Sequence, residues 1–220
     1  MNAPILCYVT DRESLPLASG GSPDRIGALL ERIERAVRGG VDWIQIREKD
    51  LEGRTLFDLT AKAMAVCAAA RSAEKQAQIL VNDRLDVAWA ARSAGVHLGE
   101  SSLPVGEVVR WRNLAGRTDF LVGASSHSLE GAVQAASAGA DYIFFGPVFA
   151  TPSKAAFGPP QGLQKLGQVC RAVSIPVLAI GGITEKNAVA CFDGGAAGIA
   201  AIRLFQEAQD LAGLLRQIRS

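Results

Sequence analysis

The sequence predicts an α/β protein with the architecture of a single TIM (β/α)8 barrel over residues 1–220. Short apolar runs typical of buried parallel strands alternate with amphipathic segments typical of helices, and eight such pairs can be counted. Glycine, which is favoured just past a helix C-terminus, recurs before even-numbered strands at Gly40, Gly95, Gly139 and Gly195. The length of 220 residues lies slightly below the roughly 250 residues typical of such barrels.

Each expected strand is a short apolar run rich in β-branched or aromatic residues. The expected strands are residues 5–10, 43–47, 79–81, 96–98, 120–124, 142–148, 177–180 and 199–202. Each expected helix repeats apolar residues every three or four positions, as Ile26, Ile33 and Val37 do in the first one. The expected helices are residues 24–38, 56–73, 86–93, 105–114, 129–138, 163–173, 185–193 and 206–218.

A doubly wound open sheet is the alternative architecture for alternating strands and helices. Such a sheet is expected to carry a GxGxxG turn after its first strand, and this sequence has none there. The barrel is therefore the expected fold.

Composition narrows the class of protein. Hydrophobic residues make up 49% of the chain and the formal net charge is +1, which favours neither disorder nor a nucleic-acid-binding surface. No signal peptide is evident, and no run reaches the roughly 18 apolar residues that a membrane span needs. We therefore expect a cytoplasmic protein without nucleic-acid or membrane partners. The four cysteines lack metal-ligand spacing and are expected to pack as small hydrophobic residues: Cys7, Cys67, Cys170 and Cys191.

A loop rich in hydroxyls and prolines follows the expected strand 142–148. Thr151, Ser153 and Lys154 offer two hydroxyls and a cation, a suitable set for the oxygens of a phosphate or diphosphate. The prolines of the loop limit its conformations and so lower the entropy lost on binding. The same segment could instead be a solvated surface loop with an ordinary lysine.

In a TIM barrel the active site lies at the C-terminal ends of the strands. Polar and cationic residues gather at these positions, and both histidines of the chain are among them. Singly, several have ordinary alternatives, such as a helix cap at Asp83 or a core histidine at His97; their convergence predicts a site. The candidates are Gln45, Arg47, Lys49, Asn82, Asp83, His97, Glu100, Ser125, His127, Thr151, Ser153, Lys154, Gly181, Gly182, Ile202 and Arg203.

The chemistry that these residues favour is anion binding. Arg47, Lys49, Lys154 and Arg203 could neutralise a diphosphate and a second phosphate, with backbone N–H groups of the Gly181-Gly182 turn and the next helix N-terminus. Asp83 could hold Mg²⁺. No zinc-like cluster and no GxSxG motif is present, so the sequence favours loss of a diphosphate leaving group over acyl transfer.

Seven motifs, in order along the chain, carry a resemblance to a known family: QIREK, VNDR, VHLGE, GASSH, GPVFATPSK, AIGGIT and GAAGIAAI. Over almost its whole length the chain resembles the thiamin phosphate synthase/TenI family. The resemblance implies a TIM barrel of the thiamin pathway that binds small phosphorylated precursors and can form a homo-oligomer. The synthase joins hydroxymethylpyrimidine diphosphate to thiazole phosphate and releases diphosphate, whereas TenI relatives isomerise thiazole carboxylate phosphate.

The resemblance also implies a role for individual positions. By this resemblance, Gln45 and Asn82 contact the pyrimidine and Asp83 binds Mg²⁺, while Ser125 matches a serine of the synthase motif. The thiazole phosphate is bound by Gly182 and the end of the eighth strand. The residues around the diphosphate are Arg47, Lys49, Thr151, Ser153 and Lys154. His127 matches an acid/base histidine of TenI proteins that synthases also carry. The expected catalytic residues are thus Lys154, His127, Arg47 and Lys49.

Two departures from the family pattern bear on the reaction. Ser102 replaces the second magnesium aspartate, and Glu100 is the alternative ligand, although backbone alternation would point it differently. Arg203 replaces a serine near the phosphate. The GESSLP segment is closer to TenI, and the Thr151/Ser153/Lys154 loop favours the synthase. We expect a synthase that uses Mg²⁺, with a thiazole tautomerase and a non-catalytic thiamin phosphate sensor as alternatives.

Overall fold

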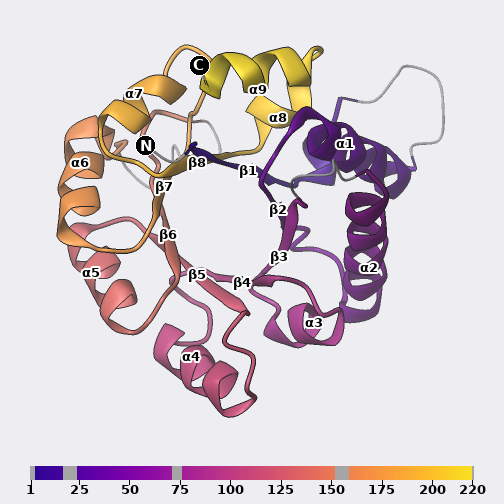
Figure 1. Cartoon of the computed structure of the whole chain (residues 1–220), viewed down its shortest axis with the longest axis horizontal. Coiled ribbons are helices and arrows are strands. Elements are labelled where there is room, and N and C mark those ends of the chain that lie inside the picture. The colour runs from indigo at the N-terminus through magenta and orange to yellow at the C-terminus, as the bar shows by residue number, and fades with distance from the viewer. Residues whose placement is uncertain (1–2, 17–23, 71–75, 152–158, 220) are drawn as a thin grey trace.

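The computed structural model describes residues 3–16, 24–70, 76–151 and 159–219. Eight parallel strands follow one another around a closed barrel, and β8 pairs with β1 to close it (Figure 1). The TIM-barrel prediction is confirmed. The strands are β1 (Ile5–Val9), β2 (Trp43–Ile46), β3 (Gln78–Asn82), β4 (Gly95–Leu98), β5 (Leu121–Ser126), β6 (Tyr142–Phe145), β7 (Val177–Ile180) and β8 (Gly198–Ala201).

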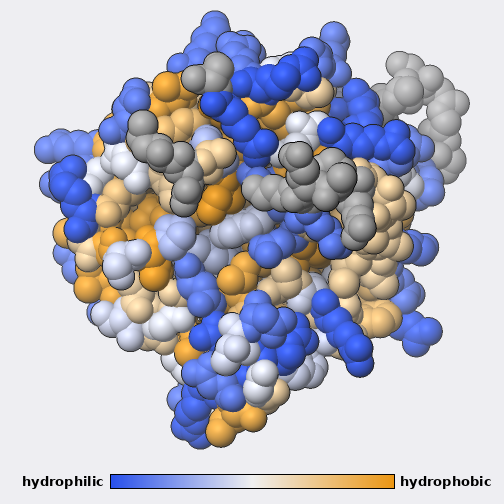
Figure 2. All heavy atoms as spheres, in the orientation of Figure 1, coloured by the Kyte–Doolittle hydropathy of each residue, from blue (hydrophilic) through white to orange (hydrophobic). Residues whose placement is uncertain are grey.

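The helices form a ring outside the strands (Figure 1). They are α1 (Arg25–Gly39), α2 (Gly53–Ala70), α3 (Leu85–Ala90), α4 (Val105–Leu114), α5 (Leu129–Ser137), α6 (Gly162–Ala172), α7 (Ala188–Asp193), α8 (Arg203–Glu207) and α9 (Leu211–Arg219), with a short 3-10 helix η1 (Arg12–Ser14) after β1. Figure 2 shows hydrophilic side chains around the outline of the molecule, over the outer surfaces of this ring. Among the described residues, no helix has the length and apolarity needed to cross a membrane.

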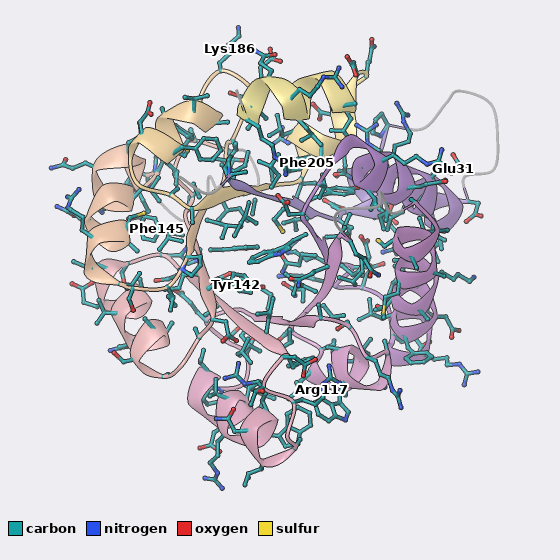
Figure 3. All side chains as sticks on the ribbon, viewed as in Figure 1. Glu31, Arg117, Tyr142, Phe145, Lys186 and Phe205 are labelled. Carbon is teal, nitrogen blue, oxygen red and sulfur yellow. The ribbon has the colours of Figure 1, made fainter. Side chains whose placement is uncertain are left out.

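Side chains alternate between the inside of the barrel and the layer beneath the helices, as the strand period of two requires. One apolar cluster fills the barrel and includes Cys7, Tyr142 and Phe144. The larger cluster lies between strands and helices and includes Phe145 and Phe205. Figure 3 shows this difference: Tyr142 lies within the ring of strands, and the two phenylalanines lie outside it. The barrel interior is thus a packed core, and a site is expected at the C-terminal ends of its strands.

Gly123 of β5 makes room for a large aromatic side chain inside the barrel. A Cβ atom at Gly123 would lie 2.0 Å from Cζ of Tyr142, on the neighbouring strand β6. Because this position carries no side chain, the Tyr142 ring lies against the β5 backbone, and its hydroxyl comes within 3.1 Å of His97 Nδ1 on β4. A glycine in β5 thereby lets the Tyr142 hydroxyl on β6 reach the buried His97 on β4.

Two aspartates repeat the same contacts on opposite sides of the barrel, at the N-terminal ends of the strands. Asp42, just before β2, accepts the backbone N–H of Leu6 in β1 and a guanidinium N–H of Arg219 in α9, each at 2.7 Å. Before β6, Asp141 accepts the N–H of Val122 in β5 and a guanidinium N–H of Arg112 in α4, each at 2.6 Å. The two sets are four strands apart, so they are related by an approximate twofold axis along the barrel.

The closing segment differs from its prediction. The expected helix 206–218 is two helices, α8 and α9, so the described residues contain nine α-helices rather than eight. Asp210 begins the second one, because its carboxylate accepts the N–H of Gly213 at 2.9 Å as an N-cap does. The helix period of the sequence continues through this break and conceals it.

Two other observed boundaries differ from the predicted ones for local reasons. The predicted helix 56–73 begins three residues earlier because the Glu52 carboxylate accepts the N–H groups of Arg54 and Thr55. The predicted strand 142–148 ends at Phe145, since Pro147 has no N–H to continue the ladder.

The two helices predicted at 86–93 and 185–193 are also shorter than expected. The first ends at Ala90, and Arg92 follows it with φ of 55°. The second begins only at Ala188, because the side chain of Asn187 binds the preceding loop.

The recurring glycines play two different roles. Gly40, Gly139 and Gly195 have φ between 93° and 99°, which confirms their prediction as residues that end a helix. Gly95 is different, because it opens β4 without a positive φ, and a Cβ there would lie 2.3 Å from the carbonyl oxygen of Leu121. Close strand contact, not a helix end, requires that glycine.

The cysteines are packed in the core as predicted. Cys7, Cys67 and Cys191 are buried, and Cys170 is partly buried. Burial raises the thiol pKa to about 11 in Cys67 and Cys170 and to about 12 in Cys191, so these side chains are uncharged near neutrality.

Candidate active site at the C-terminal ends of the strands

An amide pair lies at the upper ends of β2 and β3. The Gln45 side-chain N–H donates to the side-chain carbonyl of Asn82 at 3.0 Å, and Gln45 is almost fully buried. The two side chains point into the barrel because their strands are in register, with Gln45 opposite Leu80 and Asn82 opposite His97. The contact leaves one carbonyl of Gln45 and one amide of Asn82 for recognition of a polar ring.

A hydrogen-bonded chain crosses the barrel beside this pair. His97 contacts the Tyr142 hydroxyl through Nδ1 at 3.1 Å and the Ser125 hydroxyl through Nε2 at 2.9 Å. Burial lowers the pKa of His97 to about 3, and the nearby positive charge of Arg47 contributes in the same direction. His97 is therefore neutral at physiological pH and acts as a fixed hydrogen-bonding group that holds Ser125.

His127 follows β5 and contacts the next strand end. Its Nδ1 atom donates to the backbone carbonyl of Gly146, which can only accept, so this nitrogen carries the proton. In the neutral ring, Nε2 then keeps its lone pair. The arrangement orients His127 as a proton acceptor through Nε2.

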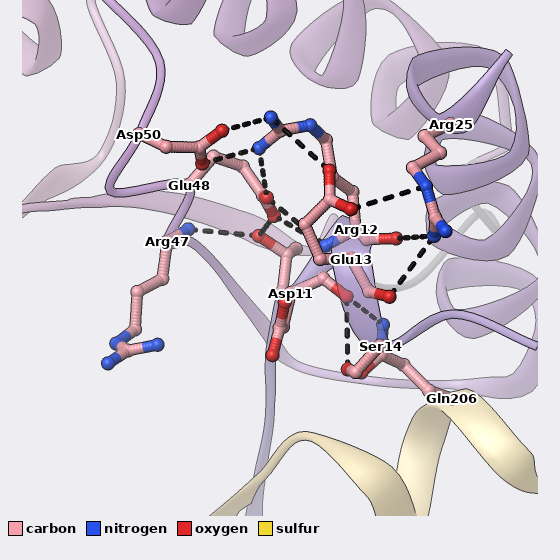
Figure 4. A network of polar contacts seen from close by, with 10 residues as sticks. Asp11, Arg12, Glu13, Ser14, Arg25, Arg47, Glu48, Asp50 and Gln206 are labelled. Atoms are coloured by element: carbon pink, nitrogen blue, oxygen red, sulfur yellow. Dashed lines mark hydrogen bonds and ion pairs between the residues drawn. The ribbon is translucent and has the colours of Figure 1, made fainter.

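The two cations that follow β2, Arg47 and Lys49, lie in a loop fixed by neighbouring polar groups. The Arg47 backbone N–H donates to the Thr10 hydroxyl at 2.9 Å, and that hydroxyl donates to Glu48 at 2.6 Å. Glu48 in turn binds Arg12, and Figure 4 shows the Arg47 side chain extending away from this network. Lys49 is exposed.

The phosphate-site candidates come from the ends of β6, β7 and β8. Gly181 and Gly182 have positive φ, and a Cβ at Gly182 would lie 2.6 Å from the Ala150 carbonyl, so the two loops pack against each other. Arg203, next to Ile202 at the end of β8, donates to the Thr151 hydroxyl at 3.3 Å. The ends of β6 and β8 are thus joined across the β7 turn.

The expected helix N-terminus behind the Gly181-Gly182 turn is absent. The next helix begins at Ala188, and the Thr184 N–H instead donates to the Asn187 side chain at 2.8 Å. Asn187 also donates to the Gly182 carbonyl at 3.0 Å. The N-terminus of α7 therefore does not directly follow the Gly181-Gly182 turn, and the backbone of this turn and Arg203 remain the anion-binding candidates here.

The carboxylates available for Mg²⁺ are few. Asp83 is exposed at the end of β3, with φ of 65°, and Arg84 rather than Asp83 stands at the N-cap position of α3. Ser102 folds back within its own loop, where its hydroxyl accepts the Gly99 N–H at 2.8 Å. Glu100 is exposed. Within the part of the chain that the structure describes, no three His, Cys, Asp or Glu side chains gather as a metal site.

Comparison with known proteins decides the family. The family model described as thiamine monophosphate synthase matches residues 18–205, most of the chain. The chain belongs to this family. The thiamine-phosphate synthase of Methanoculleus marisnigri is 45% identical over 84% of this chain and 83% of its own length. That of Chlorobium phaeobacteroides is 37% identical over 98% and 94%. The solved thiamine phosphate pyrophosphorylase of Pyrococcus furiosus has 31% identity, a TM-score of 0.79, and coverage of 98% of this chain and 93% of its own.

The structure brings six of the predicted site residues into direct contact. Gln45, Asn82, His97 and Ser125 contact one another in two pairs, and Arg203 contacts Thr151. Ser153 and Lys154 lie outside the described residues. The sequence reasoning missed residues that act behind the site: Thr10, Arg12, Glu48, Tyr142 and Asn187. The position of Glu48 in QIREK could have indicated its role. Alternation along an extended chain turns the Glu48 side chain to the face opposite Arg47 and Lys49.

Proposed function

We propose that this protein is a thiamin phosphate synthase, which couples hydroxymethylpyrimidine diphosphate with thiazole phosphate and releases diphosphate. The Gln45–Asn82 amide pair beside Arg47 is the observation that carries the proposal. The pair offers hydrogen-bonding groups to a polar heteroaromatic ring, and Arg47 offers a cation to the diphosphate attached to that ring. The names of the similar proteins support the same reaction.

The pyrimidine fits the amide pair by its chemistry. The Asn82 amide can donate to a ring nitrogen of the pyrimidine, and the Gln45 carbonyl can accept from a donor on the same ring. Beneath them the aromatic rings of Tyr142 and Phe144 form an apolar floor, with centroids 5.3 Å apart. Neutral His97 holds the Ser125 hydroxyl beside this floor without adding a charge. The pocket thus selects a flat ring with polar edges.

The reaction breaks the bond between the methylene carbon of the pyrimidine and the diphosphate oxygen, while the thiazole bonds to that carbon. Negative charge grows on the departing oxygen, so fixed cations favour this step. Arg47, Lys49 and Lys154 are the residues for it. Mg²⁺, when bound, would neutralise diphosphate oxygens. Asp83 would hold it, with Glu100 as the alternative carboxylate, and Mg²⁺ prefers few carboxylates together with substrate phosphates.

The thiazole phosphate is assigned to the other side of the barrel mouth. Arg203 and the Gly181-Gly182 turn lie at the ends of β8 and β7, and Arg203 already contacts a hydroxyl from the β6 loop. A guanidinium suits a phosphate dianion because it can donate two parallel hydrogen bonds. Charged esters of this kind do not cross a bilayer unaided, which favours a cytoplasmic location.

A thiazole tautomerase is the second candidate, and His127 favours it. Because Gly146 holds Nδ1, the Nε2 atom is oriented to take and return a proton. Ser102, in place of an aspartate, agrees with a reaction that needs no metal.

The two reactions are separated by incubating the protein with each substrate set, with and without Mg²⁺, and following the products by mass. We expect coupling of the two synthase substrates, and a loss on the order of 10²-fold in Lys154→Ala because a leaving-group cation is removed. Isomerisation without any coupling at saturating Mg²⁺ would reverse the assignment. Normal turnover by Lys154→Ala would remove Lys154 from the catalytic set.

A further inference from the structure

A buried charge network lies behind the two cations of the β2 loop. Its centre is the guanidinium of Arg12, which donates to Glu48 at 3.0 Å and to Asp50 at 2.7 Å (Figure 4). The Glu48 side chain is 2% exposed and that of Asp50 is 61% exposed. The guanidinium therefore bridges one carboxylate inside the protein and one at its surface.

The network alternates with the expected diphosphate ligands along the chain. Residues 47 and 49 are the cations, and residues 48 and 50 are the carboxylates that Arg12 binds. A backbone bond of 3.3 Å from the Leu51 N–H to the Glu48 carbonyl closes the turn. Lys49 thus lies in a turn whose residues on either side are fixed by one guanidinium.

The backbone of Arg47 is fixed by the same network. Glu48 accepts the Thr10 hydroxyl at 2.6 Å, so the oxygen lone pairs of Thr10 remain for the Arg47 N–H, which donates to it at 2.9 Å. Glu48 also accepts the backbone N–H of Arg12 at 3.1 Å. Thr10 is fully buried, which excludes water as a substitute partner.

We propose that Glu48 is a positioning residue for diphosphate binding, acting through Arg12 and Thr10 to hold Arg47 and Lys49 at the barrel mouth. The inference rests on the proposed function and deepens it. The Glu48 side chain is buried and bound to Arg12 and Thr10, so its effect on diphosphate passes through the backbone and not through contact. A side-chain amide at this position would place N–H donors against the donors of Arg12 and would release the turn.

The direction in which diphosphate affinity changes distinguishes a positioning role of Glu48 from a simple electrostatic effect. Removing a carboxylate near an anion site should tighten anion binding by Coulomb's law, because a repulsive charge is lost. If Glu48 acts by positioning, its removal instead weakens binding. Asp50→Asn makes the same comparison at a mostly exposed residue, outside the buried core.

The probe is inorganic diphosphate, titrated calorimetrically into wild type, Glu48→Gln, Asp50→Asn and Asp42→Asn. We expect Kd to rise about tenfold or more in Glu48→Gln and severalfold in Asp50→Asn, since small displacements of a binding group have effects of this size. Asp42→Asn is the matched control, because Asp42 is an equally buried carboxylate that binds a backbone N–H and an arginine at the other end of the barrel. It should lower the unfolding midpoint and leave Kd unchanged.

Steady-state kinetics supply a second measurement. Glu48→Gln should raise KM for the pyrimidine diphosphate and leave KM for the thiazole phosphate within about twofold, because the second ligand binds across the mouth. Unchanged or tighter diphosphate binding in both Glu48→Gln and Asp50→Asn would overturn the positioning role, as would an equal rise of Kd in Asp42→Asn. Wild type that binds diphosphate but does not couple would refute the proposed function alone, since the Kd comparison still tests Glu48.

Discussion

His127 donates its Nδ1 proton to the carbonyl oxygen of Gly146, so the loop after β5 and the end of β6 are joined through an imidazole. In His127→Asn the amide can still donate to this carbonyl, but the basic nitrogen is lost. We expect coupling to stay within an order of magnitude of wild type, because diphosphate departure depends on positive charge.

Deuterium uptake into thiazole carboxylate phosphate, followed by mass, is the companion measurement for His127→Asn. Any exchange shown by wild type should fall about 10²-fold or more, the usual contribution of a general base. A comparable fall in coupling would instead place His127 in the synthase chemistry.

Gly123→Ala should destabilise the fold by about 1–3 kcal/mol, the cost typical of overpacking a core, because the new Cβ lies 2.0 Å from the Tyr142 ring. Urea unfolding followed by circular dichroism measures it. The control is Gly106→Ala in α4, where the nearest heavy atoms to a new Cβ are 4.0 Å away and alanine should raise the free energy of unfolding by about 0.5–1 kcal/mol. Equal stability of the two variants would show that the barrel accommodates the extra methyl group.

His97 should make the protein less stable as the pH falls below 6.5. Its pKa is about 3 when folded and 6.5 in the unfolded chain, so between these values the unfolded state binds one more proton. The free energy of unfolding therefore rises with pH across this window, by about 1.6 kcal/mol from pH 5 to 6.5. Urea midpoints of wild type and His97→Gln at several pH values test this, and the difference between the two proteins should shrink toward low pH. Parallel pH profiles would contradict a buried neutral His97.

Ser102→Asp should lower the Mg²⁺ concentration for half-maximal coupling by about tenfold, equivalent to about 1.4 kcal/mol. An aspartate there adds a carboxylate and can still accept the Gly99 N–H that the serine hydroxyl now accepts. Coupling rates measured against Mg²⁺ provide the test. Ser101→Asp adds the same charge one residue away on an exposed side chain, and an equal effect of both variants would indicate general electrostatics instead of a metal ligand.

The sequence predicted what depends on local pattern. The eight strands were found because each is a buried apolar run, and Gln45, Asn82 and His97 were recognised as neighbours because parallel strands end at one edge. The break between α8 and α9 was missed because it depends on a cap at Asp210 within an uninterrupted apolar period.

Contacts between distant residues were harder to predict. Glu48 contacts Arg12 and Thr10 across 36 and 38 residues, and no local pattern specifies such partners. Ser102 was recognised as a departure, but its bond to Gly99 is a feature of the folded loop alone. Tyr142 was assigned to the strand, and only the missing side chain at Gly123 explains how its hydroxyl reaches His97.

The paired aspartates at the base of the barrel give the α9 and β1 side of the ring the same contacts that the internal α4–β5 connection has. Leu6 and Arg219 meet at Asp42 in the way that Val122 and Arg112 meet at Asp141. A circular permutant that is cut at the exposed loop after α4 and joined by a linker from the present C-terminus to the present N-terminus would keep both sets of contacts, with their roles exchanged. The barrel junction at β1 and the junction at β5 are therefore held in the same way, each by an aspartate, a strand N–H and a helix arginine.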